Sequence, residues 1–104
     1  MTGGARRGTI EARDDIAAEV RMAKHERTLA AIFARPTRAN VKWSDIEALF
    51  VSLGAVVEEG DGSRVHFGLN GFGATFHRPH PQKETRKYAV LEVRKFLTQA
   101  GHSS

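Results

Sequence analysis

Apolar residues recur along this chain at two spacings, and the change between them separates helical from extended segments. The clearest helical pattern lies in residues 43–54, where four apolar side chains share one face at three- and four-residue spacing: Ile46, Leu49, Phe50 and Leu53. Ser44 and Glu47 stand three residues apart at its start, which is the capping-box arrangement that satisfies N-terminal amides. Gly54 is typical of a helix end. We therefore predict a helix that begins near Ser44, with Trp43 packed on its first turn.

Weaker helical patterns lie on both sides of this segment. Residues 14–34 carry a charged helix whose apolar stripe is regular only near its end. Pro36 should end this helix, because a proline disfavours helical geometry in the residue before it. Residues 85–100 place five apolar side chains on one side, before a terminal Gly101: Val90, Val93, Phe96, Leu97 and Ala100. Residues 1–9 are rich in glycine and arginine, so we expect a disordered tail there.

Residues 55–77 alternate between apolar and polar side chains, which is typical of β-strands. Two glycine-containing pairs, Asp61-Gly62 and Asn70-Gly71, are hairpin signals. We therefore predict a meander of three strands at residues 55–59, 64–69 and 72–77. The following Arg78-Pro79-His80-Pro81 should form an extended edge loop, since a proline cannot donate a hydrogen bond to a sheet.

Alternation also predicts which side chains share a face of the sheet. The apolar residues of the last two strands should be buried together: Val65, Phe67, Leu69, Phe72, Ala74 and Phe76. Their polar neighbours then lie on the opposite face: Arg64, His66, Thr75 and His77. Because a polar face needs no helix to cover it, we predict an α+β fold of order αβββα. It has an antiparallel three-stranded sheet with helices on one face, plus an extra N-terminal helix.

Charge adds a candidate binding surface to this fold. The chain has 104 residues, of which 40% are hydrophobic, so a single small domain is expected. We place this domain at residues 23–104, with its core at 43–101, behind a flexible or partly helical tail at residues 1–22. The formal net charge of +4 arises after residue 59, where seven basic residues stand against three acidic ones, while the preceding part has nine of each. Four of the five histidines lie in the same basic part, and such a local excess favours binding to polyanions.

Composition excludes several classes of site. The chain has no cysteine, so neither disulfides nor thiolate metal sites are expected. His77 and His80 lie three residues apart, but no carboxylate completes the three or four ligands that zinc needs, so we expect no metal and no cofactor. No apolar run approaches the roughly 20 residues that span a bilayer, and the N-terminus lacks the apolar region of a signal peptide. We expect a cytoplasmic protein that does not bind a membrane.

Metal-free cleavage of RNA requires few protein groups, and the predicted polar face carries them. The 2′-hydroxyl of RNA can attack the adjacent phosphate, so the protein need supply only a base, an acid and positive charge. Histidine suits the proton transfers because its unperturbed pKa is about 6.5, and arginine grips phosphate oxygens in a bidentate way. His66 or His77 could be base or acid, with Arg64 and Arg78 as phosphate clamps. Because exposed histidines on a sheet are more often inert than catalytic, a noncatalytic RNA-binding or partner-binding module is the alternative.

Several segments, in order and at similar spacing, resemble the HicA toxins of toxin–antitoxin pairs. The helix from Lys24 to Pro36 also resembles an N-terminal extension found in one branch of that family. The segments that carry the resemblance are Ser44-Asp45-Ile46-Glu47-Ala48-Leu49-Phe50, Leu53-Gly54-Ala55, Gly62-Ser63-Arg64-Val65-His66-Phe67, Phe76-His77-Arg78-Pro79-His80-Pro81 with Lys83-Glu84, and Val93-Arg94-Lys95-Phe96-Leu97 with Ala100-Gly101. This resemblance implies a domain similar to double-stranded-RNA-binding domains that binds and cleaves mRNA. It also implies a cognate HicB-like antitoxin that covers the open sheet face.

The chain departs from the family at one important position. Most members carry their catalytic histidine directly after Gly-Ser on the second strand, where this chain has Arg64. His66 lies two residues further on and therefore on the same face, roughly 6–7 Å away. Three interpretations follow: His66 has taken over the proton transfer, Arg64 leaves a weak or inactive nuclease that still binds RNA, or His77 is the working imidazole. We favour His66, and we predict two sets of site residues. The catalytic set is His66, His77 and Arg64, and the RNA-binding set is Arg64, Arg78, His80, Lys83, Arg86 and Lys87.

Overall fold

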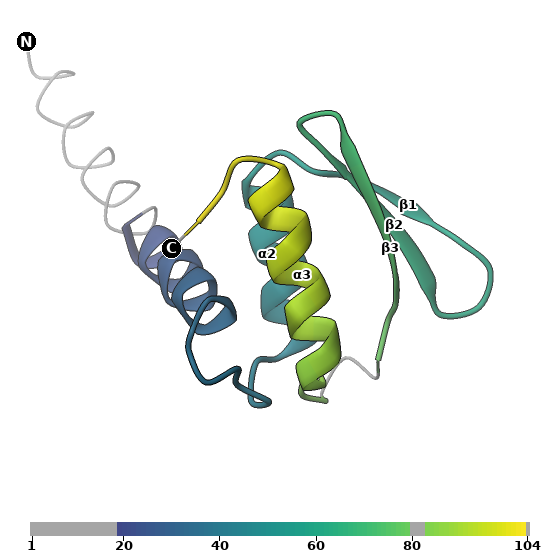
Figure 1. The fold of residues 1–104 in the computed structure, drawn as a ribbon. Helices are drawn as coiled ribbons and strands as arrows, with labels where there is room; N and C mark the ends of the chain where they lie inside the picture. Colours follow the sequence, from purple (N-terminus) through teal and green to yellow (C-terminus); the bar gives the residue numbers. More distant parts are fainter. Residues whose placement is uncertain (1–18, 80–82, 104) are drawn as a thin grey trace, which may run out of the picture.

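The computed structural model describes residues 19–79 and 83–103, which form three layers (Figure 1). An N-terminal helix, described over residues 19–32, lies on one side of α2 and α3, and the sheet lies on their other side. The elements are α2 (Trp43–Ser52), β1 (Val56–Glu59), β2 (Arg64–Leu69), β3 (Phe72–His77) and α3 (Lys87–Gln99). This order confirms the predicted α+β fold with its extra N-terminal helix. Of the tail expected at residues 1–22, only residues 19–22 are described, and they are helical.

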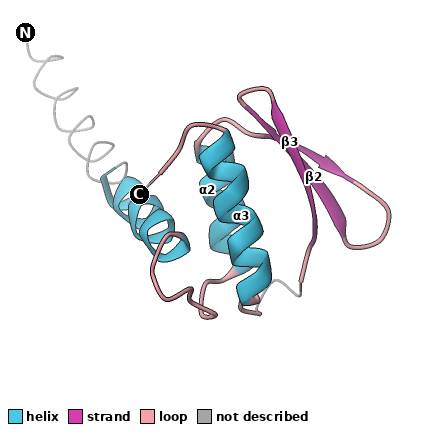
Figure 2. Cartoon of the chain, viewed as in Figure 1, coloured by secondary structure: helices cyan, strands magenta, loops and turns pink. Residues whose placement is uncertain are grey.

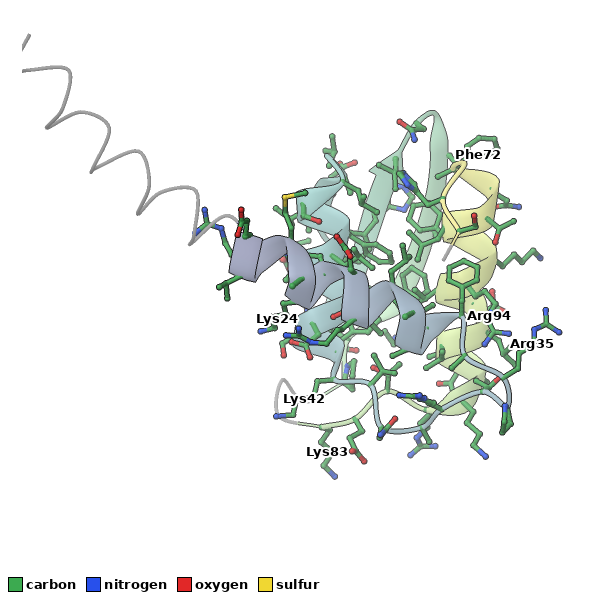
Figure 3. The ribbon with its side chains drawn as sticks, turned by 90° about the vertical axis from the view of Figure 1, so that its left-hand side faces the viewer. Lys24, Arg35, Lys42, Phe72, Lys83 and Arg94 are labelled. Carbon is green, nitrogen blue, oxygen red and sulfur yellow. The ribbon has the colours of Figure 1, made fainter. Side chains whose placement is uncertain are left out.

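The sheet is antiparallel, with β2 at its centre and β3 at one edge. Val65, Phe67 and Leu69 of β2 are buried against the helices, as alternation predicts, and so is Phe76 of β3. Phe72 departs from the prediction, because 46% of its surface is exposed. It is the first residue of the edge strand, next to the hairpin turn, where packing partners lie on one side only (Figure 3).

Five aromatic rings join the sheet to α2 and α3: Trp43, Phe50, Phe67, Phe76 and Phe96. Phe50 of α2 lies at the centre of this cluster. Its ring centroid is 4.7 Å from that of Phe67 and 5.4 Å from that of Phe96, both in edge-to-face contact. Such pairs add to the stabilisation that their buried area provides. The core therefore lies between the helices and one face of the sheet, and none of the described helices lies over the other face (Figure 2).

Helix α2 begins at Trp43, and the predicted capping box is wrong. The N-cap residue is Lys42, and within the described part of the chain no side chain caps the first amides of the helix. The carboxylate of Glu47 instead accepts hydrogen bonds from Trp43 Nε1 and from Arg78 Nε, both at 2.6 Å. The indole of Trp43 is buried in the core, so its N–H needs a partner, and Glu47 one turn later supplies it. This tertiary requirement outweighs the local capping preference.

The helix ends are set partly by glycine and partly by a contact between layers. Gly54 and Gly101 follow α2 and α3 with φ of 93° and 91°, a conformation that glycine adopts without a Cβ penalty, as predicted. The N-terminal helix stops at Ile32 rather than at residue 34. Arg94 of α3 donates from Nε and Nη2 to the carbonyl oxygen of Ile32, at 3.0 and 2.9 Å (Figure 3). The guanidinium of Arg94 thus satisfies this terminal carbonyl.

Both predicted hairpins form, with connections of different length. Asn70 and Gly71 have φ of 51° and 85°, the two positive values of a type I′ turn, whose twist matches that of the strands. The first connection is longer than the two-residue turn expected at Asp61-Gly62, because residues 60–63 all lie between β1 and β2. It is closed by a hydrogen bond from the Gly60 N–H to the Arg64 carbonyl at 2.9 Å.

Candidate nucleic-acid interface

The open face of the sheet gathers the polar residues that alternation placed there. In the β2–β3 register Arg64 lies opposite His77, and His66 lies opposite Thr75. Residues directly opposite each other on neighbouring strands share a face, so these four side chains lie together. The β1–β2 register adds Glu58, which lies opposite His66 on the other side. The predicted grouping is confirmed, and α2 and α3 lie on the far side of the sheet (Figure 1).

His66 is held in a defined orientation on this face. Its Nδ1 lies 2.9 Å from Oγ1 of Thr75, which is a hydrogen-bonding distance. Its Cε1 and Nε2 lie over Gly73, because a Cβ placed on that glycine would be 3.0 Å from both atoms. The ring therefore extends along β3 from Thr75 to Gly73, in space that a side chain at position 73 would fill. Sequence reasoning did not identify Gly73, although an isolated glycine inside a strand is a signal of close approach.

Arg64 and His77 lie at the end of the sheet where β2 begins and β3 ends. Both side chains are exposed, whereas His66 is half-buried. A shallow hollow of about 330 Å³ lies beside Arg64 and His66, and His77 is not part of its lining: Gly60, Asp61, Arg64, Val65, His66 and Thr75. An arginine and an imidazole at one hollow can contact a phosphate and exchange a proton with the same substrate.

Arg78 is engaged by two carboxylates of its own chain. Its Nη1 and Nη2 donate to the two carboxylate oxygens of Glu59 at 2.8 and 3.0 Å, and its Nε donates to Glu47 at 2.6 Å. The hydrogen bonds that Arg78 donates to Glu59 and Glu47 stabilise its charged form and raise the pKa of Arg78. The hydrogen bond from Arg78 in turn lowers the pKa of Glu59 below its ordinary value. The RNA contact predicted for Arg78 stays a prediction, and it would require exchange of these carboxylates for phosphate.

The other predicted RNA-binding residues lie beside the sheet rather than on its open face. Lys83, Arg86 and Lys87 are exposed at the start of α3, at the same end of the molecule as the end of β3 (Figure 1). A groove of about 650 Å³ runs between β3 and α3, and its lining includes His77, Lys83 and Arg86. The groove thus connects the open face to the basic start of α3. His80 lies outside the described residues.

Within residues 19–79 and 83–103, no group of three or more histidine, aspartate or glutamate residues could hold a metal ion. In the same part of the chain, no helix is long and apolar enough to cross a membrane.

Comparison with known proteins identifies a family for more than half of the chain. A family model described as the HicA toxin of bacterial toxin–antitoxin systems matches residues 43–102. The matched range begins at the first residue of α2 and ends just after α3, so it includes the whole sheet and both helices that cover it. No curated protein and no solved structure gives a significant match.

Proposed function

The chain belongs to the HicA toxin family of bacterial toxin–antitoxin systems, and we propose that it is a toxin that cleaves mRNA without a metal ion. Membership of this family implies a cognate antitoxin as its partner. The observation that supports RNA cleavage best is the open face, where His66, His77 and Arg64 lie on two neighbouring strands within one strand repeat of each other. These are the proton-transfer and phosphate-binding groups that the reaction needs.

Cleavage at this face uses the 2′-hydroxyl of the RNA as the nucleophile. The base, His66, takes the proton of this hydroxyl while the 2′ oxygen forms a bond to the adjacent phosphorus. The bond from phosphorus to the 5′ oxygen of the next nucleotide then breaks, and the acid, His77, gives that oxygen a proton. Arg64 lies opposite His77 and balances the charge that collects on the phosphoryl oxygens. The products are a 2′,3′-cyclic phosphate and a 5′-hydroxyl.

The RNA strand on either side of the cleaved bond needs further positive charge. From the open face the groove beside His77 leads to Lys83 and Arg86. We propose these two residues and the adjacent, exposed Lys87 as contacts to neighbouring phosphates. His80, the predicted contact outside the described residues, lies between His77 and Lys83 in the sequence. Binding of this kind weakens as salt rises, because each phosphate contact releases counterions.

The antitoxin is proposed to be HicB-like and to cover the open sheet face. A partner on this face would contact Arg64 and His66 directly and exclude RNA from both. Helices α2 and α3 already cover the other face of the sheet, so a partner that contacts the sheet would bind its open face.

A noncatalytic RNA-binding module is the second candidate function. It is favoured by Arg64, which stands directly after Gly62-Ser63 where the family resemblance leads us to expect the catalytic histidine. In that case the same basic surface binds RNA, and the two imidazoles contribute contacts without proton transfer.

Induced expression with growth and RNA integrity followed over time distinguishes the two functions. The wild type is compared with His66→Ala, His77→Ala and Arg64→Ala, and folding of each variant is checked by circular dichroism. We expect the wild type to degrade mRNA in the presence of EDTA, and at least one histidine variant to lose cleavage while it remains folded. Undiminished cleavage by both histidine variants would reject the proposed mechanism, and loss of activity on chelation would reject metal independence. RNA binding by a wild type that does not cleave would favour the noncatalytic module.

A further inference from the structure

We propose that Thr75 and Gly73 are positioning residues for His66, which fix the orientation and tautomer of its ring so that Nε2 is the nitrogen that takes the proton from RNA. This inference rests on the proposed function for the identity of the base. The orientation and tautomer themselves can be tested without any cleavage.

The Thr75 hydroxyl is the first half of the arrangement. It lies directly across from His66 in the β2–β3 register, and its Oγ1 is 2.9 Å from Nδ1 of the imidazole. The threonine hydroxyl could donate or accept this bond; because Thr75 is exposed, its hydroxyl proton can go to water, and we assign the proton of the neutral ring to Nδ1, which donates it to Thr75 Oγ1. In a neutral imidazole one nitrogen carries the proton and the other has a free lone pair. The bond to Thr75 therefore leaves Nε2 as the basic nitrogen.

The absence of a side chain at Gly73 is the second half. A Cβ on this residue would lie 3.0 Å from both Cε1 and Nε2 of His66, a distance at which one of the groups must move. Alanine at this position would push the reactive end of the ring away from β3. Gly68 lies opposite Gly73 on the same open face, yet a Cβ there would meet only the carbonyl oxygen of Phe72, at 4.0 Å. A Cβ at position 73 would therefore contact the imidazole and a Cβ at position 68 would not, so Gly68→Ala is a matched control for Gly73→Ala.

The other neighbour of His66 across the sheet does not compete for Nδ1. Glu58 of β1 lies opposite His66, but its carboxylate is exposed and makes no hydrogen bond to the ring. Among the described residues, Thr75 is the only side chain that bonds to this imidazole. The ring orientation consequently depends on β3, the same strand that carries His77.

Nitrogen-15 NMR of the full chain, at a pH well above the titration range of imidazole, reports which ring nitrogen carries the proton. We expect the proton of His66 on Nδ1 in the wild type, in Thr75→Ser and in Gly68→Ala. In Thr75→Val we expect a mixture of both tautomers, because the valine cannot accept the bond. The resonances are assigned with His66→Gln, which removes only this ring.

The rate of RNA cleavage by the same proteins tests whether the orientation of the His66 ring affects catalysis. We expect Gly73→Ala to lower the cleavage rate by about 10- to 100-fold, since small displacements of a reacting group have effects of this size. Thr75→Val should lower it by about tenfold and Thr75→Ser should restore it, while Gly68→Ala stays close to the wild type.

Each result supports or overturns the inference. A wild-type proton on Nε2, or a tautomer unchanged in Thr75→Val, overturns it whatever the cleavage rates are. Equal rates for Gly73→Ala and Gly68→Ala overturn the role of Gly73. If Gly73→Ala does not fold, the valine and serine variants of Thr75 still decide the tautomer. Undiminished cleavage by His66→Ala rejects His66 as the base and so overturns the role of Nε2, while the NMR result on Thr75 stands. Undiminished cleavage by both histidine variants is the separate failure of the proposed function.

Discussion

The two faces of the sheet are built from the same strands, yet different physical effects determine them. On the covered face, Phe67 and Val65 are fully buried against α2 and α3, and exclusion of water determines where their side chains lie. On the open face His66 is only half-buried, and Thr75 and Glu58 on either side of it are exposed, so burial alone cannot orient the ring. A hydrogen bond to Thr75 and the space above Gly73 orient it instead. Stability therefore depends mainly on the covered face, and chemistry on contacts between strands on the open face.

The strongest test of this comparison is Phe67→Ala. The Phe67 ring is fully buried and contacts Phe50 at 4.7 Å between centroids, so its removal leaves a cavity in the core. We expect the free energy of unfolding to fall by roughly 3–5 kcal/mol, as measured by urea denaturation. Phe72→Ala is the matched control, because nearly half of that ring is exposed, and it should lose much less. Equal losses for the two phenylalanines would contradict the division between the faces.

The second test concerns the Glu47–Arg78 contact, where the two faces meet at the end of β3. Glu47→Ala removes the acceptor of both Trp43 Nε1 and Arg78 Nε, and leaves a buried indole N–H unpaired. We expect a loss of roughly 1–3 kcal/mol in the free energy of unfolding, the range for an unsatisfied polar group. Glu58→Ala on the open face is the control and should change stability little. A Glu47→Ala variant as stable as that control would show that this contact is not structural.

Alternation of polar and apolar residues predicted the covered face, except at Phe72, and the grouping of His66 with Thr75. The Asn70-Gly71 turn signal predicted the second hairpin. These features depend on local periodicity and turn geometry, which a sequence displays directly. The errors at Glu47 and Gly73 concern contacts that tertiary packing decides. Glu47 was assigned to a capping box because its local spacing fits one, but Trp43 and Arg78 use its carboxylate. A glycine inside a strand signals close approach, but the local pattern does not show that the group approaching Gly73 is the imidazole on the neighbouring strand.

The third test measures stability and binding on the open face with Arg64→Ala. The Arg64 side chain is exposed, so the free energy of unfolding should change by less than about 0.5 kcal/mol. RNA binding should weaken, and the slope of log affinity against log salt concentration should become shallower by about one phosphate contact. Arg35→Ala is the control, because Arg35 is an exposed arginine in the loop after the N-terminal helix, away from the sheet (Figure 3). An equal change in the two slopes would mean that RNA binds by overall charge rather than at the open face.

The smallest expected effect is the pH dependence of the Arg78–Glu59 pair, whose carboxylate is exposed. The hydrogen bond from Arg78 lowers the pKa of Glu59 below its ordinary value of 4.5 in the folded protein. The Glu59 carboxylate therefore binds a proton less readily in the folded state than in the unfolded state. The pair stabilises the fold above pH 4.5, and this contribution is lost as the pH falls through the lowered pKa.

Urea denaturation of the wild type and Glu59→Gln should give curves of stability against pH that differ by a constant amount above pH 4.5 and converge below it. Glu58→Gln keeps the Arg78–Glu59 pair and serves as the matched control. A Glu59→Gln curve that runs parallel to the wild type down to the most acidic pH would show that Arg78 does not hold this carboxylate in solution, and would leave Arg78 available to RNA.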